Sequence, residues 1–582
     1  NALTGFTTGE ANVAIGQYTG DAITSGNYNV LAGRNAGGSL TTGGNNVAIG
    51  DTALASMTQY NSHIAIGPSA GSGFTAQYYS ILIGYQANTA SGGNYTTAIG
   101  YRALKDNEGG RNTAIGASAL ISNVGGDDNT AIGYSALSSN ISSNNNVALG
   151  NYAGANVIGN SNVHIGLDAG QYASGSNNTF VGRAAGQGGT TSAPYSSGQY
   201  NTAVGAYALD AFTTGYQNVA IGYQAATDLT TAYYGTYIGM YAGQNVTTGN
   251  TNTFIGWQSG NAVTDTSNKV AIGYRAGYAD GGEMDVHIGY EAGRNVTAGD
   301  NISIGRSAGQ GYHGVGQTEF QSNTTNRYNV SIGSYAGQRA IGTNSVNVGY
   351  TAGWYATGSN NTFLGSQAGK GGNSSAPYSS GEKNTAIGYQ ALTGFTTGHE
   401  NTVMGYQAAY SLTSADNNVI IGYQTGYSLT TARYNVLIGD QAGYSLSTSS
   451  DSNENVMIGN SAGRNADAAT NAAHYNVYIG SGAGYYMDDG DSNVYIGREA
   501  GKGSGTGNNA TQNILIGYQS GFSITTADGA VGVGYNSLRA LTSGGNNTAI
   551  GQQAGYSLTT PVENIAVGQA ALFYNETGNY NV

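Results

Sequence analysis

The residues that could do chemistry are few in this sequence, and they do not stand at the spacings that catalysis requires. The six histidines are scattered singly along the chain, at His63, His164, His287, His313, His399 and His474. Charged residues make up only 8% of the chain, whereas a hydrolase or lyase needs acidic or basic side chains gathered on one face. The sequence therefore predicts a protein that is not an enzyme and that binds no cofactor.

The most acidic loop is Asp-Asp-Gly-Asp, formed by Asp488, Asp489 and Asp491. Calcium takes several oxygen ligands and favours such loops. The spacing matches neither an EF-hand nor the Gly-Gly-x-Gly-x-Asp solenoid pattern, so these three residues are only weak metal candidates and no metal is expected. The glycine-rich stretch 501–507 lacks the strand-then-helix context of a phosphate-binding loop.

Aromatic residues are the more prominent chemical feature, with 46 Tyr in the chain. Many follow a recurring glycine directly, as Tyr223 and Trp257 do, and Tyr195 and Tyr378 recur in two copies of Ser-Ala-Pro-Tyr-Ser-Ser-Gly. We interpret these four as a candidate surface for binding host glycans or other receptors. The alternative, which we favour, is that stacked rings stabilise neighbouring turns.

The element that must position all these residues is a short repeat, present in 32 copies, which reads Asn-Val-Ala-Ile-Gly-Tyr-Gln-Ala-Gly. Each copy is aligned here on its anchor glycine, the Gly that follows the Val-x-Ile motif. Of the 31 intervals between anchors, 17 are 17 residues long and 8 are 16. The aligned columns predict a structural core; its representatives are Val13, Ile15, Gly16, Val219, Ile221, Gly222, Ala225 and Ala391.

β-branched residues at alternate positions indicate a strand with one buried face. A turn of 16–17 residues cannot bury its own apolar face, but identical turns stacked on one another can. We therefore predict an all-β parallel β-solenoid of about 32 turns. A second short strand is expected through the Ala column, the position three residues after the anchor, which holds Ala in 27 copies. Asn occurs four residues before the anchor in 24 copies, and either an axial hydrogen-bonded ladder or ordinary turn chemistry explains it.

Residues 1–582 are expected to form one continuous repeat array. Residues 175–218 closely match residues 358–401, which indicates duplication of blocks of many turns. Longer intervals follow Gly182, Gly305, Gly365, Gly439, Gly459 and Gly497, and they are expected to emerge as loops without disturbing the strands. The largest loop, from Gly309 to Asn329, is a candidate binding site. Because neither end resembles a solenoid cap, we expect a segment of a longer protein.

The composition excludes several classes of protein. The net charge is −13 and the sequence pI is near 4.7, so a basic stripe for nucleic acid is missing. The chain lacks Cys and lacks any run of 18 apolar residues, so no direct membrane insertion of this segment is expected. An ice-binding solenoid is disfavoured, because Thr-Thr does not recur in every turn. Low charge density suits an extracellular surface.

The repeat resembles the head repeats of trimeric autotransporter adhesins of the YadA type. Val13-Ala14-Ile15-Gly16, Val47-Ala48-Ile49-Gly50 and Val219-Ala220-Ile221-Gly222 carry this resemblance, although the turns here are somewhat longer. The repeats are also similar to those of bacteriophage tail fibre shafts. The resemblance implies a left-handed β-roll with three chains around one axis, in a bacterial surface adhesin or matrix fibre that mediates attachment. The alternative is a receptor-binding tail fibre, hence a cell-surface or virion location.

The residue between the two β-branched positions is apolar in 23 of 32 copies. If the flanking Val and Ile fill the coil's own core, this middle residue faces outward and needs covering. We therefore expect an assembly of coils, a homotrimer by resemblance, in which Phe180, Phe254, Phe363 and Leu437 are candidate inter-subunit residues. His164 and His287 share this column, so in a trimer each could form a ring of three histidines that binds an ion. The alternative, which we favour, is a packed or hydrated neutral histidine.

Overall fold

The computed structural model describes residues 2–75, 78–189, 195–296, 298–311, 326–372, 378–446, 453–465, 473–505 and 507–582. The chain forms two compact units, residues 1–279 and 280–582. Both are built of β-strands and tight turns, and the described residues contain no helix. His313 and most of the loop between Gly309 and Asn329 lie outside the described residues.

Each strand has three residues, and each is followed by an anchor glycine. The first unit holds β1 (Val13–Ile15), β2 (Val30–Ala32), β3 (Val47–Ile49), β4 (Ile64–Ile66), β5 (Ile81–Ile83), β6 (Thr97–Ile99), β7 (Thr113–Ile115), β8 (Thr130–Ile132), β9 (Val147–Leu149), β10 (Val163–Ile165), β11 (Thr179–Val181), β12 (Thr202–Val204), β13 (Val219–Ile221), β14 (Thr236–Ile238), β15 (Thr253–Ile255) and β16 (Val270–Ile272). The second unit holds β17 (Val286–Ile288), β18 (Ile302–Ile304), β19 (Val330–Ile332), β20 (Val346–Val348), β21 (Thr362–Leu364), β22 (Thr385–Ile387), β23 (Thr402–Met404), β24 (Val419–Ile421), β25 (Val436–Ile438), β26 (Val456–Ile458), β27 (Val477–Ile479), β28 (Val494–Ile496), β29 (Ile514–Ile516), β30 (Val531–Val533), β31 (Thr548–Ile550) and β32 (Ile565–Val567).

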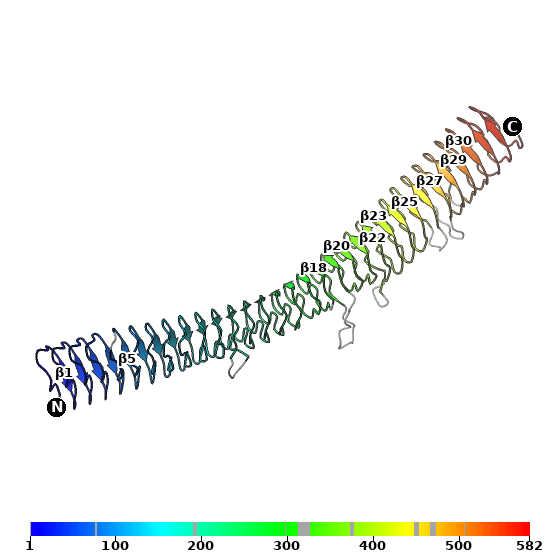
Figure 1. Cartoon of the computed structure of the whole chain (residues 1–582). Coiled ribbons are helices and arrows are strands. Elements are labelled where there is room, and N and C mark those ends of the chain that lie inside the picture. The colour runs from blue at the N-terminus through cyan, green and yellow to red at the C-terminus, as the bar shows by residue number, and fades with distance from the viewer. Residues whose placement is uncertain are drawn as a thin grey trace. The chain divides into compact units, whose positions relative to one another are not determined.

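Within each unit, every strand pairs in parallel with the next strand along the chain, which confirms the predicted parallel β-solenoid (Figure 1). In a typical pair, Ala220 of β13 lies opposite Tyr237 of β14. The register also survives the long insertions: β18 and β19, whose anchors are 28 residues apart, still pair Ser303 with Ser331. The strand register therefore continues across the insertion, as the sequence predicted.

The two halves of the internal duplication fold alike. Ala173 bridges to Ser196 in parallel, and Ala356 bridges to Ser379 in the same way. The duplicated sequence therefore specifies the same local backbone pairing in both units.

The strands face the opposite way from the sequence prediction. The middle residue is buried in every strand from β2 to β32, whereas the two flanking residues are never fully buried. Val13 is 47% exposed and Ile15 is 65% exposed, so neither is a core residue. Val219 and Ile221 of β13 are likewise partly exposed. Successive side chains of a strand point to opposite faces of the sheet. The residue pattern therefore shows that the two faces differ, but it does not show which face points into the coil, and for this reason the prediction was wrong.

The candidate inter-subunit residues are consequently core residues of a single chain. Phe180, Phe254, Phe363 and Leu437 all have 0% exposure. They share the coil's interior with the Ala column, in which Ala225 and Ala391 are also fully buried. The large rings fit because each packs against a glycine: a β-carbon built on Gly260 would lie 2.4 Å from the ring of Phe254.

The expected second strand through the Ala column does not form. The residues after the anchor glycine make a succession of tight turns, in which the residue before Ala225, Gln224, has a φ of 52° and the residue after it, Ala226, has a φ of 49°. These turns still bond to their neighbours, because the Ala226 N–H donates to the Ala242 carbonyl at 2.9 Å. Left-handed residues at alternate positions are incompatible with an extended strand.

The column four residues before the anchor forms an asparagine ladder. In the turns of β24 and β25, Asn418 Oδ1 accepts the backbone N–H of Asn435 at 2.9 Å, and Asn418 Nδ2 donates to Asn401 Oδ1 at 2.9 Å. Asn418 Nδ2 also donates to the Ala432 carbonyl at 2.9 Å. Of the two explanations left open by the sequence, the axial ladder is the one that the structure has, and it satisfies polar groups inside the coil.

The apolar core is interrupted wherever the middle column becomes polar. In the first unit one apolar cluster ends at Val157 and the next begins at Ala173, with His164 between them. In the second unit the contiguous apolar cluster begins at Ala352, after four strands whose middle residues are His287, Ser303, Ser331 and Asn347. Buried polar side chains, which could bind an ion or a water molecule, are concentrated in these stretches of the interior.

Candidate functional sites

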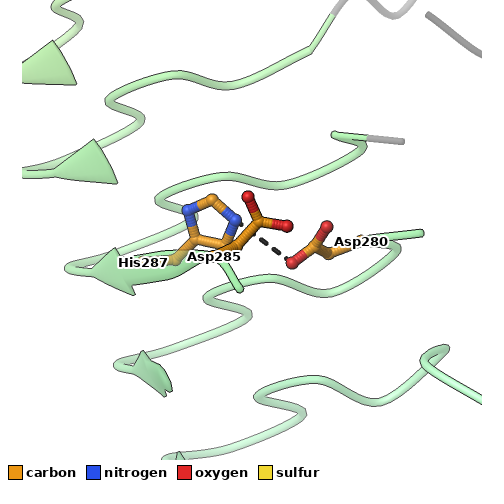
Figure 2. Close-up of side chains that lie close together, drawn as sticks. All are labelled: Asp280, Asp285 and His287. Carbon is orange, nitrogen blue, oxygen red and sulfur yellow. Dashed lines mark ion pairs between the residues drawn. The ribbon is translucent and has the colours of Figure 1, made fainter. Parts of the chain in front are cut away.

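Three titratable side chains meet inside the second unit, at its first strand. Asp280, Asp285 and His287 each offer a ligand atom within 4.8 Å of the others, and all three residues are buried. Figure 2 shows the two carboxylates and the imidazole turned toward one another. His287 Nε2 lies 3.2 Å from Asp280 Oδ2, and both side chains are only 1% exposed.

The solenoid backbone fixes this cluster. Asp285 occupies the ladder column in which Asn is usual, and its Oδ1 accepts the backbone N–H of Asn301 at 2.8 Å, as an Asn would. Asp280 Oδ1 accepts the N–H of Gly282 at 3.1 Å. His287 stands in the middle column of β17, so its ring points into the coil. The sequence signal was an Asp in the Asn column two residues before a His in the middle column.

His164 of β10 is a second buried histidine, with no acidic group clustered around it in the described part of the chain. Its ring lies 5.3 Å from that of Phe180, and neither ring nitrogen has a hydrogen-bond partner. Burial lowers the pKa of His164 from 6.5 to about 3, because the charged form loses its hydration. The imidazole is therefore neutral. It lies inside one coil, so a ring of three histidines across chains is not formed from this position.

A small cavity of about 10 Å³ lies in the polar interior of the second unit, in the turns that come after His287 along the chain. Ser303, Ser331 and Asn347 of the middle column line it, together with ladder residues Asn301 and Asn329. The Oδ1 atom of Asn347 is buried and has no protein hydrogen-bond partner. The volume and lining suit about one water molecule.

The four aromatic candidates for receptor binding all have ring neighbours. Trp257 stacks on Tyr274 with ring centroids 4.8 Å apart, and Arg275 lies over the same indole at 5.3 Å. Tyr223 meets Tyr241 edge to face at 5.5 Å.

The two duplicated tyrosines stack as well. Tyr195 stacks on Tyr172 at 6.1 Å, and Tyr378 stacks on Tyr355 at 5.6 Å. Glycans bind to the open face of an aromatic ring, and stacking along the fibre axis covers such faces. The arrangement therefore favours stabilisation between turns.

The acidic loop does not bring its carboxylates together as a ligand set. Asp488 Oδ2 accepts the backbone N–H groups of Gly507 and Asn508, and Asp491 Oδ1 accepts the N–H of His474 at 2.8 Å. The metal-ligand grouping found within the described ranges is the one at Asp280, Asp285 and His287, which sequence reasoning missed. The carboxylates of the loop act instead as acceptors that tie turns together.

No protein-family model matches the chain, and no curated protein sequence matches it significantly. Across the described residues, no helix has the length and apolar character needed to cross a membrane.

Proposed function

We propose that this chain is the shaft or head of an extracellular trimeric fibre, with a structural and adhesive role and no enzymatic one. The observation that carries the proposal is the outward face of the strands. Its two flanking columns hold Val, Ile or Thr three residues before the anchor, and Ile, Leu, Val or Met one residue before it; Ala32 is the exception. Not one charged residue interrupts either column.

This face is largely apolar, with Thr in 11 of the 32 copies of its first column, although the coil already has a core of its own. Ile49 is 39% exposed and Leu149 is 45% exposed, while the residues between the flanking positions are buried. A half-buried strand that faces water usually alternates apolar with polar residues. A long apolar stripe that is free of charge is instead typical of an interface. The residues that need a partner to cover them are therefore those of the two flanking columns, and not those of the middle column.

The proposed partners are two further copies of the same chain, packed stripe to stripe around a shared axis. Identical turns in each chain would repeat the same small contact many times, so the total interface grows with the number of turns. The number three comes from the resemblance to adhesin head repeats. A fibre of this kind would present loops and tyrosine edges in many copies, which suits multivalent attachment to cell-surface glycans or receptors.

The test is the solution mass of the purified chain. We expect three times the chain mass of 59.0 kDa by analytical ultracentrifugation. The double variant Ile221→Lys and Ile238→Lys, which places ammonium groups on the stripe, should weaken the assembly. The matched control, Gln224→Lys, adds a charge outside the stripe and should leave the mass unchanged. A monomeric wild-type chain would refute the assembly.

Adhesion needs a separate measurement. Beads coated with the wild-type chain should retain host cells, and beads coated with a mass-matched inert protein should not. Assembly without cell binding would leave a purely structural fibre. Turnover of a polysaccharide by the purified chain would overturn the non-enzymatic role.

A further inference from the structure

We propose that Asp280, Asp285 and His287 form a structural binding site for a divalent transition-metal ion of the zinc type, enclosed within the solenoid. The proposal goes beyond the fibre function, because it concerns how one turn of a single chain is held together. It rests on the position of three ligand atoms, on their burial, and on a histidine whose ring nitrogens make no hydrogen bond.

The geometry suits a small ion. A tetrahedral zinc ion with bonds of about 2.1 Å places its ligand atoms about 3.4 Å apart. His287 Nε2 and Asp280 Oδ2 are 3.2 Å apart, and the third ligand atom, from Asp285, lies within 4.8 Å of both. Rotation of the Asp285 side chain toward His287 would place three protein ligands around one centre.

His287 supplies the independent observation. Its side chain is 1% exposed, yet neither ring nitrogen makes a hydrogen bond with acceptable geometry. Nε2 is turned toward the carboxylates, as Figure 2 shows. A buried imidazole normally has its nitrogens satisfied, and metal coordination is one way to satisfy such a nitrogen.

The ligand set selects the class of metal. Calcium and magnesium prefer shells made wholly of oxygen, whereas an imidazole together with carboxylates suits zinc and its transition-metal neighbours. A divalent ion would also balance charge at two buried carboxylates, beside the hydrogen bonds that they already accept from Gly282 and Asn301. The ion would tie the loop at Asp280 to β17, at the start of the stretch where the middle column is polar and the contiguous apolar core is absent.

The experiment uses the full chain with ZnCl2 as the probe. After treatment with a chelator and dialysis, the wild-type chain should take up one zinc ion per chain, measured by elemental mass spectrometry. Zinc should also slow amide hydrogen exchange in residues 280–304. Asp285→Asn restores the usual ladder residue, and His287→Leu places a residue found elsewhere in the middle column, so both variants should fold. Each should lower zinc affinity by more than about 100-fold.

The matched control is His164→Leu, which removes a buried histidine from the same column of the first unit. It should keep both the zinc stoichiometry and the protection of residues 280–304. Equal zinc uptake by the wild type, Asp285→Asn and His287→Leu would overturn the proposal, because the bound zinc would then lie elsewhere. Absence of zinc-dependent protection in the wild type would also overturn it, and would indicate that protons or a side-chain ammonium group neutralise the carboxylates.

Discussion

Gly222 stands directly against the carbonyl oxygen of Gly239 in the next turn: a β-carbon built on Gly222 would lie 2.5 Å from that oxygen. The φ angle of Gly222 is 136°, a region that residues with a side chain rarely adopt. Successive anchor glycines therefore pack backbone on backbone. The same contact recurs at the anchors from Gly16 to Gly256 and from Gly289 to Gly551, which explains why glycine is kept at this position from turn to turn.

Replacing Gly222 by alanine should destabilise its turn by more than about 2 kcal/mol, since the new methyl group clashes with backbone and the φ angle becomes strained. The loss should appear as faster amide exchange in the turns around β13. Gly125→Ala is the control, because no atom lies within 4 Å of a β-carbon built there. A Gly222→Ala chain as protected as the Gly125→Ala chain would contradict the close packing.

Phe254→Ala and Ile255→Ala test which face of the strand is the core. Phe254 is fully buried and packs against Tyr237 at 5.7 Å, so its truncation should cost about 3–5 kcal/mol within a single chain. Ile255 faces outward, and its truncation should cost less in a dissociated chain. Denaturant unfolding of both variants, under conditions where the chain is monomeric, measures the difference. A larger loss of unfolding free energy for Ile255→Ala than for Phe254→Ala would mean that the flanking residues, and not the middle residue, face the core.

The neutral His164 should make stability fall in acid. Its pKa is about 3 in the folded chain and 6.5 when unfolded, so below about pH 6.5 the unfolded state binds a proton that the folded state excludes. Stability contributed by the neutral ring is complete above pH 6.5. It is lost toward pH 3, by up to about 1.4 kcal/mol per pH unit.

Thermal melts of the wild type and of His164→Leu between pH 7 and pH 4 isolate this effect. The difference in melting temperature should widen in favour of the variant as the pH falls. The exposed His399, changed to Gln, serves as the control and should follow the wild type. If the melting temperatures of the wild type and of His164→Leu fall in parallel with pH, the His164 ring is protonated in the folded chain without loss of stability.

The asparagine ladder should be as sensitive as the core. Asn418→Ala removes the acceptor of the Asn435 backbone N–H and the donor to the Ala432 carbonyl, which leaves buried groups unsatisfied. Each such group costs about 1–3 kcal/mol. Amide exchange near residue 435 should therefore accelerate, whereas the exposed Gln552→Ala should change little. Unchanged exchange in Asn418→Ala would mean that water replaces the lost bonds.

Much of the fold could be read from spacing. The repeat predicts the anchor glycines and the strand positions. It also predicts that β18 pairs with β19 across an insertion, because a shift of one residue in the register would turn every side chain to the other face. The metal candidate at His287 could not be read in this way. The loop before β17 brings Asp280 and Asp285 within 4.8 Å of the histidine, and no repeat column predicts where the side chains of that loop lie.

The sequence by itself determined the period, the parallel register and the identity of each column, since these depend on residue type at a fixed interval. Tertiary structure alone decided which face of each three-residue strand is inside. Alternation is symmetric, so Val219 and Ala220 could each have faced the core; the tight left-handed turns after the anchor curl the chain toward the small middle residue and leave the β-branched pair outside. The same curvature placed Phe254 in the interior and left the columns of Val, Ile and Thr on the outer side of the strands.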